Sequence, residues 1–160
     1  MRTLPLRSLG AALAVALLAA GAARAAEKRV LTLAEAKAVA AAAVEAARQA
    51  QAPGGAIAVV DDGGHVVYVE RLDGTFAAAA PLSIEKARSA AVFQRPTADF
   101  ENAIKNGRVS LVANPELLPL QGGVPIVVGG QIVGAIGVSG AASAQQDEEL
   151  AKAGAASLAK

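Results

Sequence analysis

Three side chains that could bind a ligand lie close together in segment 65–73. His65 is the only histidine of the chain, which also lacks cysteine, so it is the best candidate for a nitrogen ligand to a transition metal. Side chains alternate along a strand, so a strand over 65–72 would place His65 and Arg71 on one face, together with Asp73 if the strand continues. An imidazole, a guanidinium and a carboxylate along one sheet edge could hold a metal ion and an anion.

Each of these side chains also has a purely structural interpretation. A histidine beside a turn is often simply solvated, and Arg71 could pair with Asp73 to hold the end of the strand. Lys86, on the next predicted helix, suits recognition of a carboxylate, although single cations on helices are usually exposed to water.

Two further patterns leave alternatives open. Small residues at every second position of the last predicted strand (Val133, Ala135, Gly137, Ser139) admit either a closely packed helix or a flat ligand. The acidic residues 147–149 fall in the first turn of a predicted helix, where they could complement the helix dipole or take a cation.

Familiar catalytic motifs are absent from the sequence. The segment Gly137-Val-Ser-Gly-Ala141 lacks the final glycine of a nucleophile elbow, and the only histidine precedes it. A P-loop, a G-x-G-x-x-G turn, an H-E-x-x-H helix and an EF-hand loop do not occur. The residues therefore favour a ligand-binding protein over an enzyme.

Local signals predict the elements that position these residues. Thr32 and Glu35 have the spacing of a capping box, which predicts a helix over 33–51. Strands are expected over 56–60 and 65–72 with a turn at 61–64, helices over 81–95 and 97–107, strands over 122–128 and 131–138, and a last helix opened by Ser143 and ending near 159. Thr97 is expected to cap the shorter helix. Two hairpins among four helices indicate an antiparallel sheet covered on both faces.

The first 25 residues have the layout of a cleavable secretory signal. Arg2 and Arg7 precede an uncharged apolar run over 9–20, and Ala23-Arg24-Ala25 suits cleavage before Ala26. The apolar run is shorter than the ~20 residues that span a bilayer, so no retained membrane anchor is expected. We expect residues 26–160 to form one periplasmic or secreted domain.

Charge and composition narrow the partners. The chain carries 15 Lys and Arg against 14 Asp and Glu, and loss of the leader would remove three arginines and no carboxylate. A mildly acidic domain without a basic patch is not expected to bind nucleic acid or an anionic membrane. Few aromatics and many small side chains bury little area per residue, which points to added stability from a homo-oligomer.

Three segments in series carry a resemblance to a known family. They are VVDDGGHVVYVERLDG at 59–74, KARSAAVFQRPT at 86–97 and GGVPIVVGGQIVGAIGVSGA at 122–141. In this order they resemble the GlcG/HbpS-like family of haem-binding or haem-degrading domains. The resemblance implies an α+β fold, a profilin-like three-layer α/β/α sandwich around a five-stranded antiparallel sheet. It also implies homo-oligomers that bind haem, iron or a related tetrapyrrole, or a small organic acid.

The resemblance also implies site residues. The family motifs fall on Arg71, Asp73 and Gly74, on Lys86, on Pro96 and Thr97, and on Gly122, Gly123 and Pro125. Where family members ligate haem through a histidine in the first helix, this sequence has none over 33–51. Axial ligation would then fall to His65, to Tyr68 or to an oxygen ligand such as Thr97.

The leading hypothesis is an exported haem- or tetrapyrrole-binding protein. His65 would ligate iron, Arg71 and Lys86 would pair with propionates, and the small residues of the last hairpin would line a flat cleft. A binder of a small carboxylate, using Arg71 and Lys86 without iron, is the first alternative. A haem-degrading enzyme is the second, and it would need bound iron and a reductant.

Overall fold

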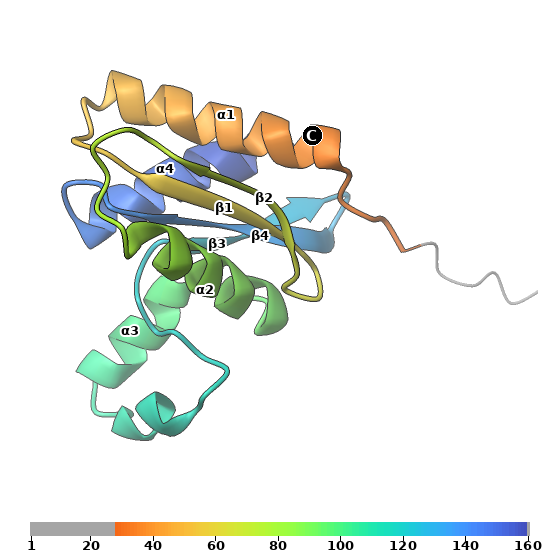
Figure 1. Ribbon diagram of the computed structural model, residues 1–160. Coiled ribbons are helices and arrows are strands. Elements are labelled where there is room, and N and C mark those ends of the chain that lie inside the picture. Colours follow the sequence, from red (N-terminus) through yellow and green to blue (C-terminus); the bar gives the residue numbers. More distant parts are fainter. Residues whose placement is uncertain (1–27, 160) are drawn as a thin grey trace, which may run out of the picture.

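A computed structural model describes residues 28–159 of the chain, and the expected leader at 1–25 lies outside them. Figure 1 shows the arrangement of the elements. In chain order they are α1 (Leu33–Gln49), β1 (Ala56–Asp61), β2 (Val66–Arg71), α2 (Ala79–Val92), α3 (Thr97–Lys105), the 3-10 helix η1 (Val109–Ala113), β3 (Gly123–Val128), β4 (Gln131–Ser139) and α4 (Ala144–Ala156).

The strands form one antiparallel sheet in the order β2-β1-β4-β3. The mixed α/β class with an antiparallel sheet is confirmed. The number of strands implied by the family resemblance, five, is wrong for the described residues, where the sheet is 4-stranded. The segment that precedes β3 instead contains η1 and an irregular stretch with Pro115 and Pro119. Proline has no N–H to donate to a ladder, so this stretch is poorly suited to extend the sheet.

Helices cover both faces of the sheet, in three layers (Figure 1). On one face α1 and α4 pack on Ile57, Val59 and Ile136 in the larger apolar core. On the other face α2 packs through small side chains, Ala87, Ala90 and Ala91, on residues of β1 and β4. Gly137 makes this approach possible, because a Cβ there would lie 2.0 Å from the carbonyl oxygen of Ser83. The small-residue face of β4 is therefore covered by a helix, and no flat cleft lies along it.

Local signals fixed several elements as expected. The Thr32 hydroxyl accepts from the backbone N–H of Glu35, and the Glu35 carboxylate accepts from the backbone N–H of Thr32, which completes the capping box of α1. The hairpin of β3 and β4 turns at Gly129 and Gly130, whose φ values of 57° and 77° are those that a tight hairpin turn requires.

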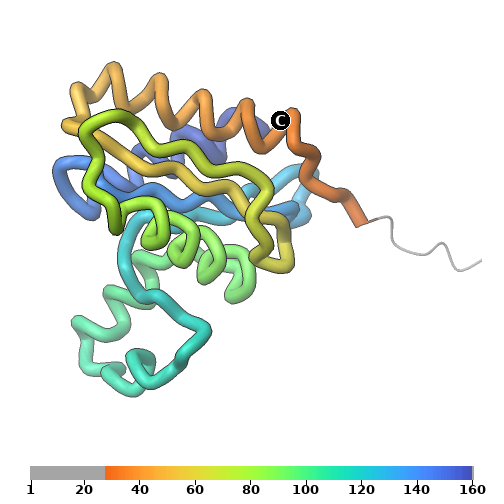
Figure 2. The backbone as a smooth tube through the Cα atoms, viewed as in Figure 1, coloured from red at the N-terminus to blue at the C-terminus, as the bar shows by residue number. Residues whose placement is uncertain are grey.

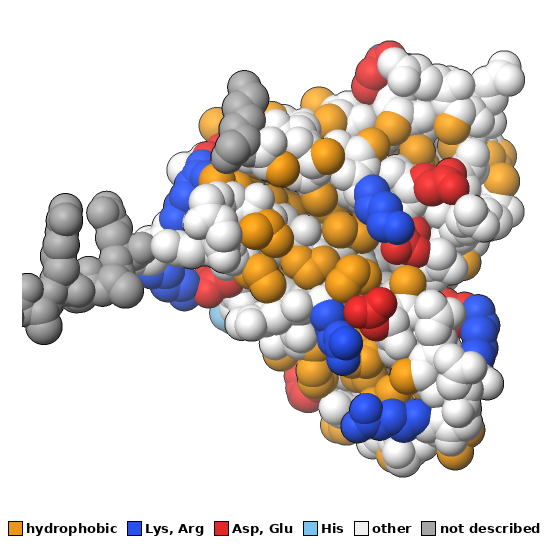
Figure 3. All heavy atoms as spheres, turned by 180° about the vertical axis from the view of Figure 1, so that it is seen from behind, with side chains coloured by type: hydrophobic (Ala, Val, Ile, Leu, Met, Phe, Trp, Pro, Cys, Tyr) orange, Lys and Arg blue, Asp and Glu red, His pale blue; other side chains and the backbone are white. Residues whose placement is uncertain are grey.

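Residues 98–121, here called the lobe, project away from the sheet and its covering helices. Figure 2 shows the lobe as a loop of chain that leaves beneath α2 and returns to β3. In Figure 3, which views the molecule from behind, it is the lower projection and carries apolar and basic side chains on its surface. Val109 and Val112 in η1 are exposed, whereas Phe100 and Leu117 are the buried residues of this segment.

Among residues 28–159, we find no helix with the length and apolar character needed to cross a membrane.

Candidate functional site

His65 lies in the turn between β1 and β2, just before the first residue of β2. Its side chain is 83% exposed, and its Nδ1 is 3.2 Å from Oδ1 of Asp61. The same carboxylate oxygen accepts from the backbone N–H groups of Gly63 and His65, both at 2.9 Å. Asp61 thus fixes the turn and the imidazole together, with Nδ1–H facing the carboxylate and Nε2 left for another partner.

The environment of Asp61 keeps its carboxylate ionised. Burial acts to raise its pKa, but the hydrogen bonds from the backbone of His65 and Gly63 and from the imidazole outweigh burial, and the pKa lies below its ordinary value. A charged carboxylate behind a histidine sets the orientation of the ring, as is common for histidines that bind metals.

Arg71 and Asp73 do not join His65 in one site. Arg71 ends β2, and the turn with His65 precedes β2, so about 20 Å of strand separates them. The pairing of β1 with β2 shifts between Val59 and Val60, and such a bulge interrupts the strict alternation assumed from the sequence. Both Arg71 and Asp73 are exposed, and among the described residues no ion pair joins them.

Tyr68, the second possible iron ligand, is committed to a neighbour on its own strand. Its hydroxyl donates to Oε2 of Glu70 at 3.1 Å, and this hydrogen bond together with the glutamate charge raises the pKa of the phenol. A raised pKa disfavours the phenolate that an iron ligand would require.

Lys86 is enclosed in the protein. Its side chain is 4% exposed, and Nζ donates to the carbonyl oxygen of Val138 and to Oδ2 of Asp147, both at 2.9 Å. The other carboxylate oxygen of Asp147 accepts from the backbone N–H of Ala141 at 2.9 Å. In this conformation the Lys86 ammonium is satisfied from within, and it joins α2 to the start of α4.

Thr97 is also buried, and it does not cap α3 as expected. Pro96 occupies the cap position without a side-chain bond. The Thr97 hydroxyl instead accepts from the backbone N–H of Gly123 at 2.8 Å and lies 3.5 Å from the carbonyl oxygen of that residue. Thr97 therefore fastens the beginning of α3 to the beginning of β3.

Gly122 and Gly123 lie against the Lys86 helix. A Cβ at Gly123 would be 2.3 Å from the carbonyl oxygen of Lys86, and one at Gly122 would be 2.9 Å from Nζ of Lys86. Gly122 also has φ 123°, a conformation that other residues rarely adopt. Four predicted site residues, Lys86, Thr97, Gly122 and Gly123, thus meet with Asp147 in one cluster, here called the neck.

Sequence reasoning missed the partners that surround the neck. Asp147 was expected at the helix surface, as a cap or a cation ligand, yet it is the buried counter-ion of Lys86. Glu101 accepts from the backbone N–H of Gln121 at 2.7 Å, and the Gln121 side chain donates to the buried carboxylate of Glu148. The only signal for these roles was the clustering of acidic residues 147–149, which does not reveal a partner 61 positions away.

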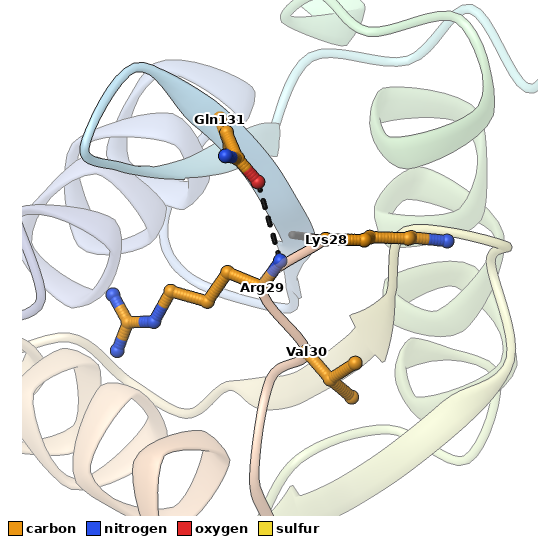
Figure 4. Close-up of a pocket in the computed structure, with 4 residues that line it drawn as sticks. All are labelled: Lys28, Arg29, Val30 and Gln131. Carbon is orange, nitrogen blue, oxygen red and sulfur yellow. Dashed lines mark hydrogen bonds between the residues drawn. The ribbon is translucent and has the colours of Figure 1, made fainter. Parts of the chain in front are cut away.

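A cavity of about 650 Å³ lies elsewhere, lined by Lys28, Arg29, Val30 and Gln131 (Figure 4). The close-up shows the backbone N–H of Arg29 bonded to the Gln131 side chain, while the Lys28 and Arg29 side chains diverge. Gln131 begins β4 and Ser139 ends it, so this cavity and the neck lie at opposite ends of that strand. Lys28 pairs with Asp62, and Arg29 pairs with Glu35, so both cations already have carboxylate partners.

Among residues 28–159, no group of three or more acidic or histidine side chains is placed to hold a metal ion.

Most of the residues that the structure describes match one known protein family. Residues 31–156 match the family described as haem degrading protein HbpS-like. The chain belongs to the HbpS-like family. The HbpS-like chain is 52% identical to protein GlcG of Escherichia coli strain K12 over 83 residues, which are 52% of this chain. It spans 62% of the length of that relative.

Solved structures share the fold. A double mutant of HbpS from Streptomyces reticuli is 31% identical, with a TM-score of 0.77 and coverage of 100% of each chain. Protein ORFY of Klebsiella pneumoniae is 28% identical, with a TM-score of 0.74, covering 84% of this chain and 94% of that one. A structure described as a PduOC:heme complex is 21% identical, with a TM-score of 0.71 over 82% of this chain and 100% of the other. This similarity shows that the two chains share a fold.

Proposed function

We propose that this HbpS-like protein is an exported haem-binding protein whose iron ligand is His65. One observation carries the proposal: the exposed imidazole is held at Nδ1 by the Asp61 carboxylate, which leaves Nε2 directed to an external partner. A histidine nitrogen is a common axial ligand of haem iron, and His65 is the only histidine of the chain.

The relatives add support at the level of the family. The matching family is described as haem degrading, and a structural neighbour is described as a haem complex. The description of the family also keeps open a haem-degrading activity. Such an activity would require bound iron and a reductant in addition to the residues described here.

Propionate recognition by Lys86 and Arg71 needs revision in this proposal. Lys86 is enclosed, and Arg71 lies at the far end of β2 from His65. Arg88 is closer to the turn, because a Cβ at Gly64 would lie 2.9 Å from Cγ of Arg88. Its guanidinium is 46% exposed and pairs with Glu116 at 2.9 Å, an exposed contact that a propionate could replace at little cost.

A small carboxylate is the second candidate ligand, and Arg71 favours it. The guanidinium of Arg71 is exposed at the end of β2, and among the described residues no carboxylate pairs with it. A guanidinium free to make two parallel hydrogen bonds is well suited to a carboxylate. This binding mode needs no iron.

The proposal includes the cellular setting. The signal-like residues 1–25 support a setting in the periplasm or outside the cell, and the small-residue core favours a homo-oligomer.

Titration of the purified protein with haemin, followed by absorbance, tests the proposal. We expect saturable binding, with the affinity lowered at least about tenfold by His65→Ala and less by Asp61→Asn, which removes only the orienting charge. Arg71→Ala is the matched control and should leave haemin affinity unchanged. Equal affinity of His65→Ala and the unsubstituted protein would overturn the role of His65, whereas a lack of saturable binding would favour the carboxylate ligand.

A further inference from the structure

The lobe begins and ends at the neck. Residue 98 follows Thr97 and residue 121 precedes Gly122, and the hydrogen bond from Gly123 to Thr97 joins these two points directly. The buried Lys86–Asp147 pair and the close approach of both glycines to Lys86 hold this junction against α2 and β4. A segment whose ends are tied together can move without changing the path of the chain on either side.

Little else attaches the lobe to the rest of the protein. The backbone N–H of Leu118 donates to Oγ of Ser89 at 2.8 Å, Glu116 pairs with Arg88 on the surface, and the Gln121 side chain reaches Glu148. Phe100 packs edge-on against Phe93, with ring centroids 5.5 Å apart, and Arg95 lies over the Phe100 ring and pairs with Asp99 on the surface. Few buried apolar contacts and exposed polar ones are the marks of a segment that opens locally at low free-energy cost.

We propose that the lobe opens as a unit about the neck while the sheet and its helices remain folded. Opening uncovers Ser89 on α2, which is buried when the lobe is closed. A ligand that used this part of α2 would bind the open form. The proposal does not depend on the identity of the ligand or on binding at His65.

Two serines of α2 provide a matched test. Ser89 and Ser83 are both buried, but Ser89 accepts its bond from the lobe whereas Ser83 bonds to Ala80 within α2 and faces β4. The chain has no cysteine, so Ser89→Cys and Ser83→Cys would each introduce a single thiol. We expect a thiol reagent to label Ser89→Cys about 100-fold faster than Ser83→Cys under native conditions.

A neck variant strengthens the test. Thr97→Val removes the acceptor of the Gly123 N–H and leaves that donor buried when the lobe is closed. It should raise labelling of Ser89→Cys about tenfold and leave Ser83→Cys unchanged. Equal labelling of the two thiols, or an equal increase of both by Thr97→Val, would overturn the proposal, because both results mean exposure by global unfolding.

Hydrogen exchange of the unsubstituted protein tests the opening of the lobe without any destabilisation caused by a cysteine substitution itself. Amides of α3 and η1 should exchange together, faster than those of β1 and β4. Exchange of all four elements at one common rate would contradict an independent lobe.

Discussion

The helix α2 and the lobe that follows it bury their side chains to very different extents. α2 is 14 residues long and buries Lys86 together with a nearly continuous stripe of small residues, namely Ala79, Ser83, Ala87, Ser89, Ala90 and Ala91. Across residues 98–121 only Phe100 and Leu117 are buried. The two segments are adjacent in sequence, yet one is part of the core and the other is held mainly at its ends.

This difference shows that helix content is a poor guide to local stability. α3 has an amphipathic sequence and a cation–π contact of Arg95 over the Phe100 ring at 5.3 Å, but it has little protein to pack against. Most stability of a helix comes from packing of its apolar face, so the lobe is expected to be the less stable unit.

Glycine substitutions should separate the two regions most strongly. In Gly137→Ala the new methyl would meet the backbone of Ser83 and Ala87, which cannot move aside, so we expect a loss of about 3 kcal/mol or more. In Gly107→Ala, in the lobe, the methyl meets nothing within 4 Å, and only φ 96° opposes it, at about 1–2 kcal/mol. Urea unfolding measures both values, and similar losses would show that the lobe is packed as tightly as α2.

Breaking the neck should have the next largest effect. Lys86→Met leaves the Asp147 carboxylate buried without its cation, and we expect the free energy of unfolding to fall by about 3–5 kcal/mol. Arg48→Met is the control, since Arg48 and its partner Glu45 on the same helix are both exposed, a contact worth less than about 1 kcal/mol.

The double variant of Lys86→Met and Asp147→Leu should recover much of the loss, because an apolar pair leaves no buried charge. If Lys86→Met costs no more than Arg48→Met in urea unfolding, the ion pair does not hold the neck.

The smallest expected effect is a dependence on pH. The pKa of Glu101 lies below its ordinary value of 4.5, mainly because the Lys105 side chain donates a hydrogen bond to the carboxylate. Burial acts to raise this pKa, whereas the Gln121 N–H and the charges of Lys105 and Lys86 lower it further. A lowered pKa in the folded state means that the carboxylate stabilises the protein above pH 4.5 and that this contribution is lost as the pH falls through the folded-state pKa.

Glu101→Gln tests this effect, since it keeps an acceptor for Gln121 but removes the charge. Above pH 4.5 the variant should be less stable by about 0.5–1 kcal/mol, and the difference should vanish on acidification. Lobe amides, followed by hydrogen exchange, should report the change more strongly than amides of β1. A difference that persists unchanged to low pH would exclude the Glu101 charge as its source.

Much of the fold was predictable because its signals are local. The capping box of α1, the turn at Gly129 and Gly130 and the position of both hairpins depend on residues a few positions apart, whose conformational preferences act in any context. The end of α2 was placed three residues too late, at 95 in place of Val92, because Pro96 was taken as the terminator. The chain leaves the helix earlier, and Gln94 adopts φ 56°.

The candidate site was predictable only in part. Four residues that the family motifs single out, Lys86, Thr97, Gly122 and Gly123, lie together in the neck. Their expected chemistry, ligand contact, was inferred from residue type, yet burial decides whether an ammonium or a hydroxyl is available. The pairing of β1 with β2 shifts between Val59 and Val60, and no pattern of apolar residues revealed that shift.

The sequence by itself determined the helices, the two hairpins, the membership of the HbpS-like family and the single histidine on which iron binding would depend. Only the tertiary structure decided that Lys86 meets Asp147, 61 positions away, that Thr97 binds Gly123 instead of capping α3, and that the lobe has little to pack against. The physical reason is the sequence separation over which each interaction acts. Backbone preferences and capping act between neighbours, whereas desolvation and ion pairing depend on which distant groups the completed fold brings together.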